Sequence, residues 1–133
     1  MSEVTINDTM TVGNQLVDLC RKGKEREAIE TLYAPDIVSI EAYGGPDMPQ
    51  RVEGLADVIG KAEWWENNNE VHSRQVSGPY PHGDRFIVQF KYDITSKAGP
   101  MAGQRMTMDE TALYRVADGK VVHEEFFYHV PNM

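Results

Sequence analysis

The period of the hydrophobic pattern changes half-way along the chain. In the first half, apolar side chains recur every three or four residues, which is the spacing of an amphipathic helix. The clearest such stripe consists of Met10, Gly13, Leu16, Val17 and Cys20. In the second half, apolar and polar side chains alternate, most regularly over 84–96, and this period of two is typical of strands. A helical half followed by a strand half predicts an α+β fold.

The expected elements follow from this pattern and from the residues that break it. Helices are expected over 9–20, 25–33 and 55–68, and the second of them should stop before Pro35. One strand, over 37–43, is expected between the second and third helices, followed by a four-strand meander over 71–78, 84–96, 103–116 and 121–130. Glycine and proline mark loops at 44–49, 78–84 and 97–103, and the sequence ADGK at 117–120 predicts a tight hairpin.

The composition is that of a small acidic domain. The chain has 133 residues, 21 acidic against 13 basic side chains for a net charge of −8, and one cysteine, Cys20. This length suits a single domain over 1–133, and one cysteine excludes a disulfide framework. Because the sequence has no basic stripe with interleaved aromatic residues, nucleic acid is not an expected partner. The sequence also shows no signal-peptide pattern and no run of about 18 apolar residues, so we expect a cytoplasmic location without membrane association.

Two segments carry a resemblance to a known family. They are YAPDIVSIEAYGG at 33–45 and LYRVADGKVVHEEFFY at 113–128. In this order and spacing they resemble the ketosteroid-isomerase-like, SnoaL-like branch of the nuclear transport factor two superfamily. The resemblance implies a curved mixed sheet wrapped around the N-terminal helices, a cystatin-like α+β cone whose open end is a pocket. It also implies a homodimer packed through the convex face of the sheet.

The resemblance assigns a candidate general base. Reading forward from Tyr33-Ala34, Glu41 matches the acid that removes a proton in ketosteroid isomerases, and an apolar cone would raise the pKa of such a carboxyl group. A solvent-facing acid at the end of a strand is the alternative. The family's two oxyanion-binding groups have no match, since the first helix has no tyrosine and Thr111 stands at the position of the second acid. True ketosteroid isomerisation is therefore not expected.

Strand alternation predicts which other side chains face the pocket. Counted back from the hairpin, the inward positions are Thr107, Asp109, Thr111 and Leu113, and the outward ones are Met106, Met108, Glu110 and Ala112. On the last strand, Glu124, Phe126 and Tyr128 are expected to face inward. His72 matches a pocket-facing position, and Gln89, Lys91 and Asp93 are placed inward by the turn before them. A slip of one residue would reverse any of these assignments.

These positions give candidate roles. Asp109 and Glu124 would share a pocket wall, where like charges raise at least one pKa; alternatively, Lys91 or Arg105 neutralises one of them as a structural ion pair. His72 could shuttle a proton, and the hydroxyl of Tyr128 could replace the missing tyrosine. We expect the catalytic residues to be Glu41, Asp109, His72 and Tyr128. We expect ligand contacts from Tyr43, Val58, Trp65, Lys91, Thr111, Leu113, Glu124 and Phe126.

The side chains expected to face outward bear on two kinds of partner, a metal ion and a second copy of the chain. His123, Glu125 and His129 share one strand face but converge poorly, so we expect no metal and no cofactor. The apolar side chains assigned to the convex face are too many to face water, and they predict a dimer surface. They are Phe86, Val88, Phe90, Tyr92, Met106 and Met108.

Together the observations predict a SnoaL-like small-molecule enzyme without a cofactor. The expected chemistry is that of an isomerase, cyclase or dehydratase acting on an apolar, carbonyl-bearing substrate. The alternative is a non-catalytic domain of the same fold that binds a small ligand or serves as a dimeric accessory module. A third possibility is epoxide hydrolysis by Asp93, Arg105 and Asp109 around a water molecule.

Overall fold

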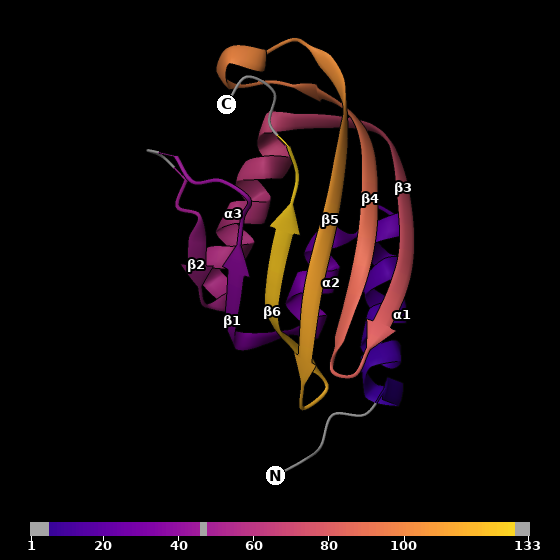
Figure 1. The fold of residues 1–133 in the computed structure, drawn as a ribbon. Coiled ribbons are helices and arrows are strands. Elements are labelled where there is room, and N and C mark those ends of the chain that lie inside the picture. The colour runs from indigo at the N-terminus through magenta and orange to yellow at the C-terminus, as the bar shows by residue number, and fades with distance from the viewer. Residues whose placement is uncertain (1–5, 46–47, 130–133) are drawn as a thin grey trace.

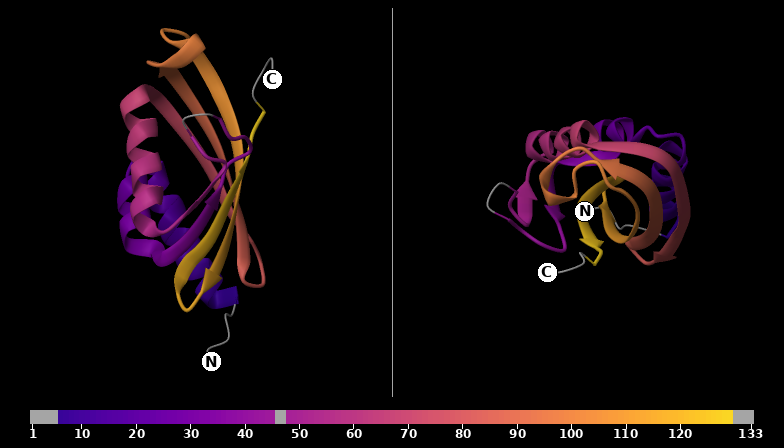
Figure 2. Two further views of the ribbon diagram at one scale, coloured as in Figure 1. Left: turned by 90° about the vertical axis from the view of Figure 1, so that its left-hand side faces the viewer. Right: turned by 90° about the horizontal axis from the view of Figure 1, so that it is seen from above.

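The computed structural model describes residues 6–45 and 48–129. Three helices, α1 (Ile6–Arg21), α2 (Glu25–Leu32) and α3 (Leu55–Asn68), lie on the same side of one curved sheet (Figures 1 and 2). The strands are β1 (Tyr33–Ile40), β2 (Arg51–Glu53), β3 (Asn69–His82), β4 (Arg85–Ser96), β5 (Arg105–Ala117) and β6 (Lys120–Phe127). A short 3-10 turn, η1 (Gly99–Met101), lies between β4 and β5.

The sheet is mixed and open. Its strand order is β2-β1-β6-β5-β4-β3, and β1 runs parallel to β6 whereas the other neighbours are antiparallel. The long strands β3, β4 and β5 bend around the helices (Figure 2). This architecture confirms the predicted α+β class with three helices and a curved mixed sheet. No helix within the described ranges is long and apolar enough to cross a membrane.

Most element boundaries lie close to the predicted ones. Helix α3 begins and ends where its periodicity and the following asparagines indicate. Strand β1 begins earlier than expected, at Tyr33, because an extended backbone accommodates Pro35 as readily as a loop does. Strand β2 was not predicted. The last strand ends at Phe127, three residues before the predicted end at position 130, which itself lies outside the described residues.

The predicted turn at 78–84 is mostly strand. β3 continues to His82, and the chain reverses at Gly83-Asp84. The register of β3 against β4 shifts between Ser77 and Tyr80, so Gly78-Pro79 forms an irregularity inside the strand instead of ending it. Proline and glycine therefore mark a bulge here and not a turn, and both residues are known to occur at bulges in sheets.

The inward faces of β4 and β5 are the opposite of those predicted. Val116 pairs with Val121, but Arg115 pairs with His123, so Val122 is an extra residue in β6. This β-bulge sets Tyr114 opposite Glu124, whereas uninterrupted alternation would set Leu113 there. Since Glu124 faces the helices, the inward positions of β5 are the even-numbered ones, and β4 follows in register.

The apolar residues assigned to a dimer surface consequently belong to the core. Phe86, Val88, Phe90 and Tyr92 are buried beneath the helices, and Met106 and Met108 pack against the same cluster. The prediction that these residues cover a convex dimer face is wrong. A homodimer stays a prediction of the family resemblance, without this support.

Candidate functional site

A cavity of about 680 Å³ lies between the helices and the sheet. Its wall is formed by side chains from all three helices, from β1, β3, β4, β5 and β6, and from the segments after β1 and β6. Aromatic rings and carboxyl groups dominate this wall. The size is that of a site for a small organic molecule.

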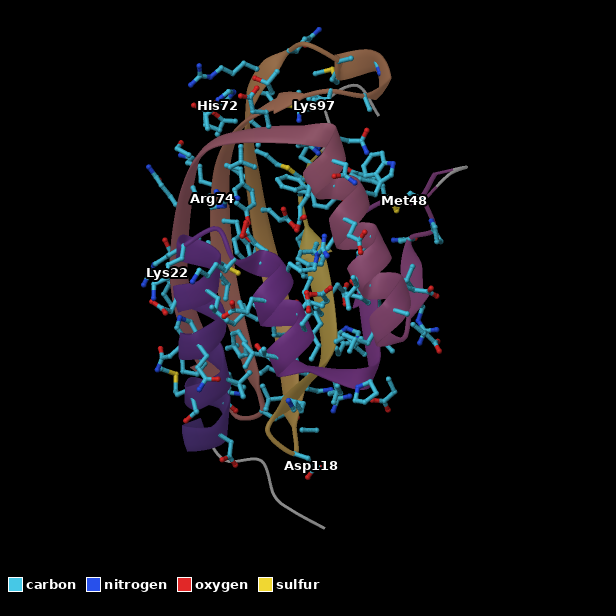
Figure 3. The ribbon with its side chains drawn as sticks, turned by 180° about the vertical axis from the view of Figure 1, so that it is seen from behind. Lys22, Met48, His72, Arg74, Lys97 and Asp118 are labelled. Atoms are coloured by element: carbon cyan, nitrogen blue, oxygen red, sulfur yellow. The ribbon has the colours of Figure 1, made fainter. Side chains whose placement is uncertain are left out.

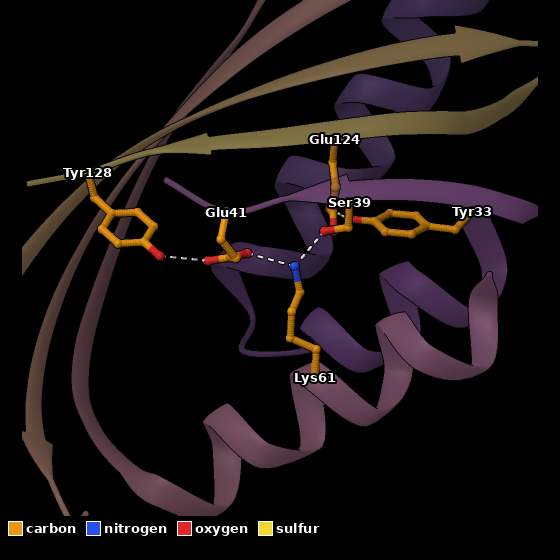
Figure 4. A network of polar contacts seen from close by, with 6 residues as sticks. All are labelled: Tyr33, Ser39, Glu41, Lys61, Glu124 and Tyr128. Carbon is orange, nitrogen blue, oxygen red and sulfur yellow. Dashed lines mark hydrogen bonds and ion pairs between the residues drawn. The ribbon is translucent and has the colours of Figure 1, made fainter. Parts of the chain in front are cut away.

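Glu41 reaches into the cavity just after β1 ends. The Tyr128 hydroxyl donates a hydrogen bond to its Oε1 at 2.9 Å, and Lys61 Nζ lies 2.7 Å from its Oε2 (Figure 4). The side chains of Lys61 and Glu41 are 13% and 18% exposed, so this ion pair is shielded from water while still lining the cavity. Desolvation on that scale strengthens the electrostatic interaction between the two groups.

The same lysine connects Glu41 to a second, buried carboxyl group. Lys61 Nζ donates to Ser39 Oγ at 2.6 Å, and Ser39 Oγ donates to Glu124 Oε2 at 2.6 Å. The Tyr33 hydroxyl donates to the other oxygen of Glu124. The parallel pairing of β1 with β6 causes this contact, because it sets Ser39 directly beside Glu124. One continuous network thus joins Tyr128, Glu41, Lys61, Ser39, Glu124 and Tyr33 (Figure 4).

The pKa of the Glu124 carboxyl is raised, above all by burial. The positive charge of Lys61 and the hydrogen bonds from Ser39 and Tyr33 act in the opposite direction. Burial likewise raises the pKa of the Tyr33 hydroxyl, and the neighbouring Glu124 adds to that effect. The buried end of the network therefore holds protons more tightly than the same groups do in water.

Glu110 is a third carboxyl group of the cavity wall. Burial, followed by the charges of Glu41 and Glu124, raises its pKa to about 8, while Lys61 acts against this rise. Within residues 6–45 and 48–129, no hydrogen bond or ion pair holds this carboxyl group. Glu110 is thus mostly protonated at neutral pH and is free to meet a ligand.

Four predicted site residues on the sheet face away from the cavity. Lys91, Asp109 and Thr111 line a separate hollow of about 350 Å³ on the opposite face, with Lys91 paired across the strands to Asp109. Leu113 has the same orientation. The bulge at Val122 is the reason, since it shifts the inward face of β5 by one residue. The acid of this strand that enters the cavity is Glu110 and not Asp109.

His72 is also outside the cavity. It is exposed on the edge strand β3 (Figure 3). Its Nε2 shares a hydrogen bond with Thr95 Oγ1 at 2.7 Å. The register of β3 against β4 shifts between Val71 and Ser73, which makes His72 an extra residue in its strand. Val71 and Arg74 line the cavity instead, so a proton shuttle through His72 is not available.

The remaining predicted contacts do line the cavity. They are Tyr43, Val58, Trp65, Glu124, Phe126 and Tyr128. Trp65 packs against Tyr92 with ring centroids 5.6 Å apart, and Tyr43 meets Tyr128 edge to face at 6.0 Å. Sequence reasoning missed Lys61, although it follows Val58 by three residues and precedes Trp65 by four, which sets all three on one side of α3.

Two other predicted clusters do not form a site in the cavity. Arg105 makes a two-pronged ion pair with Asp93, at 2.9 and 2.8 Å, and neither these two residues nor Asp109 line the cavity, so the epoxide-hydrolase arrangement is not part of this site. His123 Nε2 lies 3.4 Å from Glu125 Oε1. Across the described part of the chain, no group of three or more histidine, cysteine, aspartate or glutamate side chains is placed to hold a metal ion.

Comparison with known proteins identifies the family. Residues 7–128 match the model of the SnoaL-like domain. The chain belongs to the SnoaL-like family. A search among curated proteins finds no match.

Solved structures share the SnoaL-like fold. A proposed SnoaL-like polyketide cyclase from Mesorhizobium loti is 39% identical with a TM-score of 0.82, over 90% of this chain and 97% of that one. A second proposed SnoaL-like polyketide cyclase, from Jannaschia sp. CCS1, is 20% identical with a TM-score of 0.72, over 96% and 89%. A protein with a cystatin-like fold from Xanthomonas campestris is 16% identical with a TM-score of 0.69, over 92% and 91%. The last two show the fold alone.

Proposed function

We propose that this SnoaL-like protein is an enzyme that moves a proton next to a carbonyl group of a small molecule bound in the cavity. The observation that carries the proposal is the placement of Glu41, whose carboxylate lines the cavity between the Tyr128 hydroxyl and the Lys61 ammonium. A carboxylate held by two donors has a fixed orientation, which general base catalysis requires. An isomerase, cyclase or dehydratase would all use such a step.

The chemistry follows from the groups present. Glu41 takes a proton from the carbon next to the substrate carbonyl. The electrons of the broken C–H bond form a C=C bond, and the π electrons of the carbonyl group move to its oxygen to give an enolate. Lys61 uses two of its three ammonium hydrogens on Glu41 and Ser39, so a third is left for the enolate oxygen. Lys61 thereby supplies the electrostatic stabilisation for which ketosteroid isomerases use a tyrosine and a second acid. Return of the proton from Glu41 to another carbon or oxygen completes the reaction.

Exchange of substrate protons with solvent tests this proposal whatever the product of the reaction is. A panel of cyclic ketones, β-diketones and aromatic β-ketoesters is incubated with the protein in D₂O, and loss of the α-proton signal is followed by NMR. The wild-type protein should accelerate exchange for at least one class, and Glu41→Gln should slow that exchange by a factor of about 100 or more. A panel on which the protein has no effect contradicts the proposal.

One observation favours a second candidate function, a binding domain without catalysis. Both oxygens of Glu41 are already engaged, one by Tyr128 and the other by Lys61, as in a structural ion pair. In that case a ligand of the cavity would bind equally well to the wild-type and Glu41→Gln proteins. Neither protein would accelerate the exchange of the ligand's α-protons with solvent.

A further inference from the structure

Acidic side chains outnumber basic ones in the cavity wall. Five carboxyl groups line it, from Glu25, Glu41, Glu66, Glu110 and Glu124, against three cations, from Arg26, Lys61 and Arg74. Each cation is paired with one of the carboxylates. Arg74 lies 2.8 Å from Glu25, Lys61 lies 2.7 Å from Glu41, and Arg26 lies 3.1 Å from Glu66.

Two carboxyl groups are therefore left without a cation of their own. Glu124 is buried and accepts hydrogen bonds from Ser39 and Tyr33, so its oxygens are satisfied by the protein. Glu110 has no such partner among the described residues, although it faces the same cavity. A polar group that the fold brings to a cavity and leaves unpaired is expected to meet a ligand.

A chain of aromatic rings begins on the strand next to Glu110. Its direct neighbour across the strands is Phe90, which faces inward as Glu110 does. Phe90 stacks on Tyr92 with centroids 5.7 Å apart, and Tyr92 packs against Trp65. The faces of such rings carry negative charge and attract cations. Carboxyl groups in excess beside aromatic faces disfavour an anionic ligand and favour a cationic one.

We propose that the ligand of this cavity carries a positively charged amine or ammonium group, which sits between Glu110 and the rings of Phe90 and Tyr92 while the rest of the ligand extends toward Glu41. The inference rests on the proposed use of the cavity for a small molecule and adds the chemical class of that molecule. It does not depend on whether Glu41 transfers a proton.

Binding of a cation beside Glu110 should depend on pH. The groups that face Glu110 are Glu41, Lys61 and Glu124, together with the hydroxyls of Tyr92, Tyr114 and Tyr128, whose pKa values are all raised. A bound cation favours the ionised form of Glu110, so binding must displace the proton that Glu110 holds below about pH 8. Affinity for a permanent cation should therefore increase about tenfold from pH 7 to pH 9.

A pair of matched probes tests the proposal. Choline carries a trimethylammonium group whose charge does not change with pH, and 3,3-dimethylbutan-1-ol has the same shape with carbon in place of nitrogen. Both are titrated into the protein at pH 7 and pH 9, and binding is followed by NMR chemical shifts. We expect choline to bind more tightly than its neutral analogue at both pH values, and the tenfold increase to be confined to choline.

Two variants assign the effect to its residue. Glu110→Gln should weaken choline binding at pH 9 about tenfold and abolish the pH dependence of that binding. Asp109→Asn removes a carboxylate from the opposite face of the sheet, so it should change neither the affinity for choline nor its pH dependence. Circular dichroism checks that each variant is folded. If Glu110→Gln does not fold, the pH dependence of choline binding to the wild-type protein still tests the proposal. Equal binding of the two probes, binding of neither, or tighter binding at pH 7 would overturn the proposal. None of these outcomes bears on proton exchange by Glu41.

Discussion

Lys61 holds the polar side of the cavity together. Its ammonium group contacts Glu41 and Ser39 directly and lies 5.3 Å from the centre of the Phe126 ring. Through Ser39 it also compensates part of the charge of the buried Glu124. Two carboxyl groups on one wall are tolerated because this cation stands between them.

Replacement of Lys61 by methionine tests that role. The variant leaves Glu41 without its ion-pair partner and removes a positive charge near Glu124, so we expect the free energy of unfolding at pH 7 to fall by about 2 kcal/mol, less than for a fully buried pair. The loss should shrink at pH 5, where carboxyl groups take up protons. Urea denaturation at both pH values measures it.

Lys22→Met is the matched control. Lys22 pairs with Asp18 at 3.0 Å, but both side chains are more than half exposed. Removal of such a surface pair should cost less than about 0.5 kcal/mol at either pH. An equal loss in the two variants would contradict the role given to Lys61.

Glu110 makes the stability of the protein depend on pH. Its carboxyl group releases its proton near pH 8 in the folded state, against an ordinary value of 4.5 that applies on unfolding. Between these values the folded state binds the additional proton, so the free energy of unfolding falls as pH rises. From pH 5 to pH 7.5, the wild-type protein should lose about 2–3 kcal/mol relative to Glu110→Gln. Parallel stability curves for the two proteins would contradict the raised pKa.

At the scale of the elements, the sequence predicted more than it missed. Helix α3 and the order of helices and strands follow from periodicity, because a stripe of apolar residues has few other ways to be buried. The inward face of β6 was also predicted, with Glu124 and Phe126 reaching the cavity. These features depend on local patterns, which one sequence contains in full.

The missed features depend on single extra residues. The bulge at Val122 reversed the predicted faces of β4 and β5, and the one at His72 turned that histidine outward. The alternation does not reveal such an extra residue. Over 106–113, the odd and the even positions of β5 each contain four side chains of mixed polarity, so either set could face inward. The long alternating run of β4 could have indicated the correct inward face, because its apolar side fits a core better than a surface.

Adjacent residues of β4 test the observed register. Phe86 is 1% exposed and Ile87 is 37% exposed, so the two side chains lie on opposite faces. Phe86→Ala should lower the free energy of unfolding by about 3–5 kcal/mol, and Ile87→Ala by less than about 1 kcal/mol. Chemical denaturation of both variants compares them. Equal losses, or a greater loss at Ile87, would contradict the register.

In the whole molecule, the open sheet and the three helices enclose a large cavity, which is lined in part by aromatic rings and has a polar network along one side. The fold brings Glu41, Lys61 and Tyr128 together from the end of β1, from α3 and from the segment after β6. A homodimer through the outer face of the sheet stays a prediction, which sedimentation can test. Neither the cavity nor its network depends on that partner.

The rate of α-proton exchange from a bound ketone in D₂O, compared among the wild-type protein, Glu41→Gln and Glu53→Gln, tests directly whether Glu41 is a general base. Glu53 lies on β2 with an exposed side chain, so its replacement removes the same charge outside the cavity. We expect Glu41→Gln to lower the rate by a factor of about 100 or more and Glu53→Gln to leave it unchanged. Equal rates in the wild-type and Glu41→Gln proteins would contradict this role of Glu41.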